Sequence, residues 1–97
     1  MADYALTDKV IILTGAAGGI GQVMAREFAS ASAHVVLVGR TEKSLNAVAE
    51  TLGKSRSMVV PTDITDPDLV ENLIATTVEA FGRVDAIVNN AGGGAMP

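Results

Sequence analysis

The sequence predicts an α/β fold, a doubly wound parallel sheet of about four strands in the order 3-2-1-4 with three helices. Four short apolar runs alternate with three segments of helical periodicity, which is typical of a parallel sheet with crossover helices. Two glycine-bearing turns, Thr14–Gly21 and Asn89–Gly92, each follow an apolar run. Ligands of such sheets bind beyond the carboxyl ends of the strands, so the two turns predict one shared nucleotide site.

Hydrophobic periodicity places the elements along the chain. The apolar runs that predict strands cover about residues 9–14, 33–38, 57–61 and 85–89. The helical patterns cover about residues 20–31, 42–52 and 67–81. The first helix is expected to bury Ile20, Val23, Met24 and Phe28. The second is expected to bury Leu45, Val48, Ala49 and Leu52, and the third Leu69, Val70, Leu73, Ile74, Thr77, Val78 and Phe81.

Capping residues mark the ends of the second and third helices. Thr41 is expected to be the N-cap of the second helix, and Gly53 its stop. Asp66 is a good N-cap for the third helix, and Pro67 fits its first turn. Gly82 is expected to end that helix.

The glycines of the first turn each have a physical role. Gly15 lets the chain leave the strand sharply, where a Cβ would restrict φ. Gly19 and Gly21 keep side chains away where the backbone approaches a pyrophosphate and where the helix packs on the strand. The following helix presents free N–H groups and its positive dipole end to the phosphates. The spacing G-x-x-x-G-x-G departs from the general G-x-G-x-x-G fingerprint, and a tight turn without a ligand is the alternative interpretation.

The composition excludes several classes of function. A net charge of −4 argues against nonspecific binding of nucleic acid. The absence of cysteine excludes disulfides, cysteine zinc sites and thiol nucleophiles, and the single histidine, His34, is too little for a metal site. No apolar run is long enough to span a membrane, and the first residues lack the features of a signal peptide. A cytoplasmic location is therefore the default expectation.

Three motifs together resemble the N-terminal half of a short-chain dehydrogenase/reductase. They are Thr14-Gly15-x-x-x-Gly19-x-Gly21, then Asp63, then Asn89-Asn90-Ala91-Gly92, and the resemblance in order and spacing runs from about Lys9 to Gly94. It implies that residues 1–97 form the N-terminal half of an NAD(P)-binding Rossmann domain. It also implies the family's reaction, hydride transfer between a nicotinamide dinucleotide and a carbonyl or alcohol.

The residue at the end of the second strand bears on which dinucleotide binds. NAD sites of this fold usually carry an acidic residue there, which bonds the ribose hydroxyls. Here Gly39 is followed by Arg40, whose guanidinium can hold a 2′-phosphate with charge-assisted hydrogen bonds. NADP(H) is therefore favoured. NAD(H) stays possible, because the family's other NADP mark, a basic residue within the glycine turn, would fall at Gly18 and is missing.

The resemblance implies a set of cofactor-binding residues and no metal site. In the family, the residue at Asp63 bonds the adenine amino group, the Ile64 backbone meets the ring, and the residues at 90–92 line the inner ribose. Asn89 is expected to hold the fourth strand in place. The full expected set is Gly15, Ala17, Gly18, Gly19, Ile20, Gly21, Arg40, Thr41, Asp63, Ile64, Asn90, Ala91 and Gly92.

The family's catalytic Ser, Tyr-x-x-x-Lys and Asn lie beyond the asparagine motif, so no catalytic residue is expected within this chain. Its single tyrosine, Tyr4, has Asp8 rather than lysine four residues later. Three interpretations follow: the N-terminal portion of an NADP(H)-dependent oxidoreductase, a dinucleotide-binding module or truncated fragment without catalysis, or another Rossmann protein such as a methyltransferase. A carbonyl or alcohol substrate would need the missing C-terminal half. A homo-oligomer is expected, because the fourth strand would otherwise leave an open apolar edge.

Overall fold

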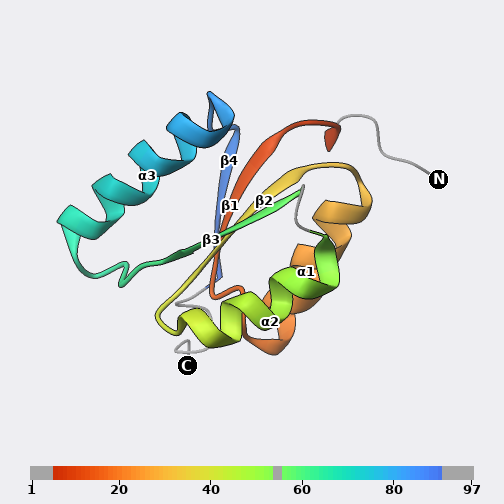
Figure 1. Ribbon diagram of the computed structural model, residues 1–97, viewed down its shortest axis with the longest axis horizontal. Helices are drawn as coiled ribbons and strands as arrows, with labels where there is room; N and C mark the ends of the chain where they lie inside the picture. Colours follow the sequence, from red (N-terminus) through yellow and green to blue (C-terminus); the bar gives the residue numbers. More distant parts are fainter. Residues whose placement is uncertain (1–5, 54–55, 91–97) are drawn as a thin grey trace.

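The computed structural model describes residues 6–53 and 56–90. It contains one parallel sheet of four strands in the order β3-β2-β1-β4, which confirms the predicted fold class. The strands are β1 (Val10–Thr14), β2 (His34–Gly39), β3 (Ser57–Pro61) and β4 (Ala86–Asn89). The helices are α1 (Gly19–Ser30), α2 (Glu42–Leu52) and α3 (Pro67–Phe81). Helices α1 and α2 cover one face of the sheet and α3 covers the other (Figure 1).

Two apolar clusters follow from the alternation of side chains along the strands. One cluster joins the sheet to α1 and α2 and comprises Leu13, Ala16, Ala25, Val35, Leu37, Leu45 and Val48. The other joins the sheet to α3 and comprises Val10, Ile12, Val36, Val38, Val60 and Leu73. Each fully buried Leu, Ile or Val stabilises the fold by about 1.5–3 kcal/mol. Strand β1 is buried at all five positions, because it has a neighbour on both sides and helices on both faces.

The expected buried face of α1 is partly wrong. Ile20 is 70% exposed and Val23 is 53% exposed, whereas the buried residues of the helix are Gly21 and Ala25. Small residues form the contact because the helix lies very close to the preceding turn. Met24 and Phe28 are partly buried against the core, as expected.

The caps of the other helices agree with the prediction in most details. Asp66 Oδ1 accepts hydrogen bonds from the backbone N–H groups of Asp68 at 3.0 Å and Leu69 at 3.4 Å. Gly82 adopts the left-handed conformation at the end of α3. Thr41 occupies the N-cap position of α2, but its side chain makes no capping hydrogen bond.

The apolar faces of α2 and α3 are confirmed with two exceptions. On α2, Leu45 and Val48 are buried, and Ala49 and Leu52 pack against the same cluster. On α3, Leu73 and Thr77 are buried. Leu69 and Val78 are 40% and 44% exposed, because they lie at the two margins of an apolar face that is wider than the sheet covers.

Ion pairs and backbone bonds tie the chain together at the amino ends of the strands. Arg56 Nη1 donates to Asp8 Oδ1 at 2.9 Å and to the carbonyl oxygen of Ser32 at 2.7 Å. Asp8 and Ser32 both have positive φ, at 61° and 70°, and the Asp8 N–H donates to the Ser32 carbonyl at 2.9 Å. Three connecting segments are thereby joined before the strands begin.

Asp85 joins β4 to β1 at this same end. Its Oδ2 accepts from the Val10 N–H at 2.8 Å, and its own N–H donates to the Val10 carbonyl at 2.9 Å. Arg83 donates to Asp85 Oδ1 from Nε at 3.0 Å and from Nη2 at 2.6 Å. The Val10 hydrogen bond and the Arg83 guanidinium hold the pKa of the Asp85 carboxyl below its usual range.

No helix within residues 6–53 and 56–90 is long and apolar enough to cross a membrane.

Candidate functional site

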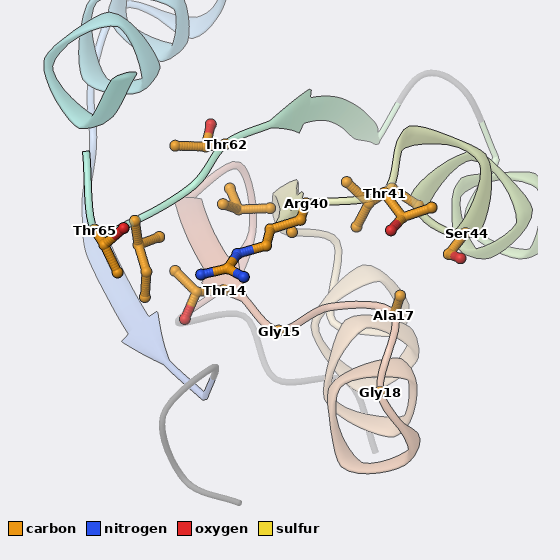
Figure 2. Close-up of a pocket in the computed structure, with 13 residues that line it drawn as sticks. Thr14, Gly15, Ala17, Gly18, Arg40, Thr41, Ser44, Thr62 and Thr65 are labelled. Carbon is orange, nitrogen blue, oxygen red and sulfur yellow. The ribbon is translucent and has the colours of Figure 1, made fainter. Parts of the chain in front are cut away.

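A cavity of about 510 Å³ opens at the carboxyl ends of the strands, between the turns that follow β1, β2 and β3 (Figure 2). The turn after β1 contributes Thr14, Gly15, Ala17 and Gly18. The end of β2 and the start of α2 contribute Val38, Gly39, Arg40, Thr41, Ser44 and Leu45. The segment after β3 contributes Thr62, Ile64 and Thr65. This is the edge of the sheet at which the sequence predicted a nucleotide site.

The glycine turn is held by one internal backbone hydrogen bond and by one bond from a side chain of α1. Gly15 has φ +66°, a conformation that side chains with a Cβ rarely adopt. The Gly18 N–H donates to the Gly15 carbonyl at 3.2 Å. Gln22, which the sequence did not single out, donates from Nε2 to the Ala17 carbonyl at 2.8 Å and so fastens the turn to the first part of α1.

Gly19 and Gly21 differ in what surrounds them. A Cβ on Gly21 would collide with the Gly15 carbonyl oxygen and would lie 2.9 Å from Ala16 Cα, so this glycine is required by the fold itself. A Cβ on Gly19 would meet no protein atom within 4 Å in the described part of the chain. Gly19 stands at the N-terminus of α1, where free N–H groups and the helix dipole attract anions.

Arg40 extends from the end of β2 toward the segment that follows β3 (Figure 2). Its side chain is 72% exposed, and Nη2 lies 3.4 Å from Asp63 Oδ1. A long, exposed ion pair of this kind stabilises a protein little, so the guanidinium can turn toward an anion at small cost. No carboxylate is among the described residues that line this part of the cavity. The hydroxyl group of Ser44, another residue that the sequence did not single out, lines it beside Thr41.

Asp63 does not line the cavity but bonds two residues that do. Its Oδ1 accepts from Thr65 Oγ1 at 2.6 Å and from the Thr65 N–H at 2.9 Å, in addition to Arg40. The Thr65 side-chain hydrogen bond is the main reason that the pKa of the Asp63 carboxyl lies below its usual range. Asp63 is thus held as a carboxylate at the edge of the cavity, next to Ile64.

Asn89 and Asn90, the described part of the asparagine motif, lie beside the glycine turn. Thr14 Oγ1 donates to Asn89 Oδ1 at 3.0 Å and accepts from the Asn90 N–H at 3.0 Å. Asn90 Nδ2 donates to the Gly15 carbonyl at 3.3 Å. The structure therefore joins β4 to the turn after β1 through both asparagines, and the Thr14 hydroxyl is the bridge between them.

The structure brings most of the expected site residues to one place. The expected residues that line the cavity are Gly15, Ala17, Gly18, Arg40, Thr41 and Ile64. Five other expected residues do not line it: Gly19, Ile20 and Gly21 at the start of α1, Asp63 after β3, and Asn90 after β4, which bonds the Gly15 carbonyl. Ala91 and Gly92 lie outside the described residues.

Comparison with known proteins identifies relatives along most of the chain. Residues 9–97 match the family model of the short chain dehydrogenases. An uncharacterized oxidoreductase of Staphylococcus aureus is 42% identical over 87 residues, which cover 90% of this chain and 38% of the relative. Meso-2,3-butanediol dehydrogenase of Serratia marcescens is 39% identical over 85 residues, which cover 88% of this chain and 34% of that enzyme.

A solved structure shares both the fold and part of the sequence. The L-sorbose reductase of Gluconobacter frateurii, complexed with NADPH and L-sorbose, superposes with a TM-score of 0.85 at 35% sequence identity. The match covers 93% of this chain and 35% of that chain. The present chain thus spans between a third and two fifths of the length of these relatives.

Proposed function

This chain belongs to the short-chain dehydrogenase family, and we propose that it forms the cofactor-binding part of an NADP(H)-dependent oxidoreductase. One observation carries the choice of cofactor: the exposed guanidinium of Arg40 stands at the end of β2, beside the cavity, where an NAD site carries a carboxylate. The chain spans only part of its relatives. Hydride transfer with a small carbonyl or alcohol is therefore proposed for the whole protein.

The site residues fit a nicotinamide dinucleotide, which supplies the hydride acceptor or donor when it is bound. We assign the pyrophosphate to the glycine turn and to the free N–H groups at the start of α1, because a Cβ at Gly19 would occupy the open space there. Asp63 and Ile64 are assigned to the adenine. Asn90, Ala91 and Gly92 are assigned to the inner ribose, and Ile20 to the cofactor face of α1.

The 2′-phosphate is assigned to Arg40, with Thr41 and Ser44 as hydroxyl donors. Arg40 is always charged and can form two parallel hydrogen bonds to a phosphate. The Thr41 side chain makes no capping bond to α2 and is available to a ligand. The 35%-identical reductase that is complexed with NADPH supports NADPH as the cofactor by analogy. NAD(H) is the alternative cofactor, because Gly18 supplies no positive charge to the glycine turn.

The test is a calorimetric titration with NADPH and with NADH. Arg40→Leu should weaken NADPH binding by about 10- to 100-fold, since charge-assisted hydrogen bonds are lost, and should leave NADH binding within about threefold. Arg40→Lys keeps the charge, so its NADPH affinity should lie between those of the unmodified chain and Arg40→Leu. Adding Gly39→Asp should favour NADH further, although its Cβ would lie 3.3 Å from Leu45 Cδ2 and require a small shift. An unmodified chain that binds NADH at least as tightly as NADPH would contradict the proposal.

A dinucleotide-binding module without catalysis is the second candidate function. It applies to these 97 residues taken by themselves, because they include no Tyr-x-x-x-Lys. A measurement of substrate-dependent NADPH oxidation distinguishes the two functions. We expect no such oxidation from these 97 residues alone. Membership of the family removes the methyltransferase alternative.

The proposal also covers the oligomeric state and the cellular location of the protein. Strand β4 pairs with β1, and within the described residues no strand lies on its other side. Its Ile87 is 57% exposed. Such an edge recruits a further strand, from a longer chain or from a second copy, and we propose that the protein works as a homo-oligomer. A monomer of 9.9 kDa in light scattering at high concentration would argue against this. A cytoplasmic location stays a prediction.

A further inference from the structure

The segment between β3 and α3 holds a carboxylate whose two oxygens have different surroundings. Asp63 Oδ1 accepts three hydrogen bonds, two from Thr65 and a longer one from Arg40. No donor among the described residues bonds Asp63 Oδ2. The side chain is 41% exposed, so a ligand can reach it. The carboxylate is thus fixed through one oxygen and keeps its acceptor capacity on the other.

The Thr65 hydroxyl is not needed to start the following helix. Helix α3 has its own N-cap in Asp66, which accepts bonds from two free N–H groups of the first turn. The Thr65 hydroxyl instead donates its hydrogen bond, 2.6 Å long, to Asp63 Oδ1. Thr65 also lines the cavity together with Thr62 and Ile64 (Figure 2). The hydroxyl therefore orients a carboxylate at the edge of the proposed cofactor site.

We infer that Thr65 is a positioning residue for adenine recognition: it holds Asp63 by Oδ1 and so presents Oδ2 to the exocyclic amino group of the adenine. This inference rests on the proposed function, because it takes the cavity to be a dinucleotide site. A carboxylate already held in one rotamer has less freedom to lose when the ligand binds. Arg40 can turn from Asp63 to the 2′-phosphate while the Asp63 carboxylate stays in place, since both hydrogen bonds from Thr65 remain.

The test compares NADPH with its deamino analogue, reduced nicotinamide hypoxanthine dinucleotide phosphate. The analogue keeps the phosphates and riboses but carries a carbonyl oxygen where adenine has the amino group. Hypoxanthine also carries a proton on N1, so the ratio of the two dissociation constants reports the base edge that bears the amino group and N1. The variants are Thr65→Val, which removes the hydroxyl and keeps the backbone N–H, and Thr65→Ser, which keeps both. Thermal unfolding of each variant checks that it is folded.

The unmodified chain should bind the analogue about 10- to 100-fold more weakly than NADPH, because a charge-assisted hydrogen bond is lost. Thr65→Val should reduce this discrimination by about 2- to 10-fold, because Asp63 loses one of its two bonds from Thr65 and keeps the other, and Thr65→Ser should restore it. Arg40→Leu is the matched control. It should weaken both ligands equally and leave the ratio unchanged, because the 2′-phosphate is common to both.

A second measurement needs no ligand. The Thr65 hydroxyl lowers the pKa of the Asp63 carboxyl, so an NMR titration of Thr65→Val should show that pKa move up toward its ordinary value. An unchanged Asp63 pKa overturns the inference, as does a Thr65→Val variant that keeps the full discrimination or weakens both ligands in proportion. If the unmodified chain binds neither ligand, the proposed function fails and the inference with it. If it binds both and only the Thr65→Val result is negative, the proposed function stands.

Discussion

At the amino ends of the strands two carboxylates are held by short hydrogen bonds, although the buried Nδ1 of His34 has no partner there among the described residues. At the carboxyl ends Arg40 is held only loosely, and the start of α1 at Gly19 borders open space. At the amino ends, Arg56 bonds Asp8 and the Ser32 carbonyl at 2.9 and 2.7 Å. Asp85, whose side chain is 19% exposed, bonds the Val10 N–H at 2.8 Å and an arginine as well. The Arg56 contacts and the Asp85–Val10 bond are short, and they join segments that are far apart in the sequence.

The carboxyl ends hold the same kinds of groups in a looser arrangement. Arg40 is 72% exposed and reaches Asp63 at 3.4 Å. The backbone at Gly19 borders open space, and the neighbouring turn lines a cavity of about 510 Å³. One end of the sheet therefore secures the fold, and the other keeps donors and charge available, which is the arrangement expected of a binding site in an open α/β sheet.

Gly21→Val should have the largest effect, because the packing of α1 on the glycine turn leaves no room for a Cβ at this position. The new side chain would overlap the Gly15 carbonyl and press on Ala16, and overpacking of this severity costs roughly 3 kcal/mol or more. We expect little folded protein by circular dichroism and thermal unfolding. A Gly21→Val chain with unchanged stability would show that α1 and the glycine turn are less closely packed than described.

Gly19→Val is its matched counterpart and should separate folding from binding. The Cβ at this position meets no protein atom within 4 Å in the described part of the chain, so the stability should be close to that of the unmodified chain. NADPH affinity should fall by at least about tenfold, since the side chain would block hydrogen bonds from backbone N–H groups to the pyrophosphate. Unchanged affinity in calorimetry would remove the glycine turn from the proposed site.

Arg56→Met should weaken the opposite end of the sheet without touching the site. The substitution keeps much of the apolar stem and removes both hydrogen bonds. We expect a loss of about 1 kcal/mol in the free energy of unfolding, because the ion pair is partly exposed. Urea unfolding measures the loss. NADPH affinity should not change, and a large loss of affinity would mean that the two ends of the sheet are coupled.

Asp85→Asn should produce the smallest effect and a distinct pH dependence. The folded-state pKa of Asp85 is lowered, so its carboxylate stabilises the fold above about pH 4, and this contribution is lost as the pH falls through the folded-state pKa. The difference in melting temperature between the unmodified chain and Asp85→Asn should therefore be largest near pH 7 and shrink below pH 4. Glu50→Gln on the exposed side of α2 controls for the loss of a charge. A difference independent of pH would contradict this account of Asp85.

The contrast between the two ends also explains what the sequence could predict. Strands, turns and the Asp66 cap depend on residues within a few positions, so local patterns place them. The Arg56 and Asp85 contacts join residues 48 and 75 positions apart, and no local pattern reports such a pairing. The same holds for Ser44 and Thr65, which become site residues only when three turns converge.

The error at α1 has a different physical cause. Periodicity ranks residues by hydropathy and therefore placed Ile20 and Val23 on the buried face. The actual contact is set by how closely the helix approaches the turn: there is no room for a Cβ at Gly21, and the small Ala25 is the other buried residue of the helix. Sequence patterns identify the apolar residues of a helix but not the separation at which the helix packs.

Hydrogen–deuterium exchange with and without NADPH tests most directly whether the carboxyl ends of the strands form the binding site. We predict that the cofactor slows exchange in three segments, residues 15–21, 40–44 and 63–65, which come from the three turns around the cavity. Exchange around Asp8, Ser32 and Arg56 should not change. Protection confined to that opposite end, or no protection in the three turns at a saturating NADPH concentration, would contradict the account.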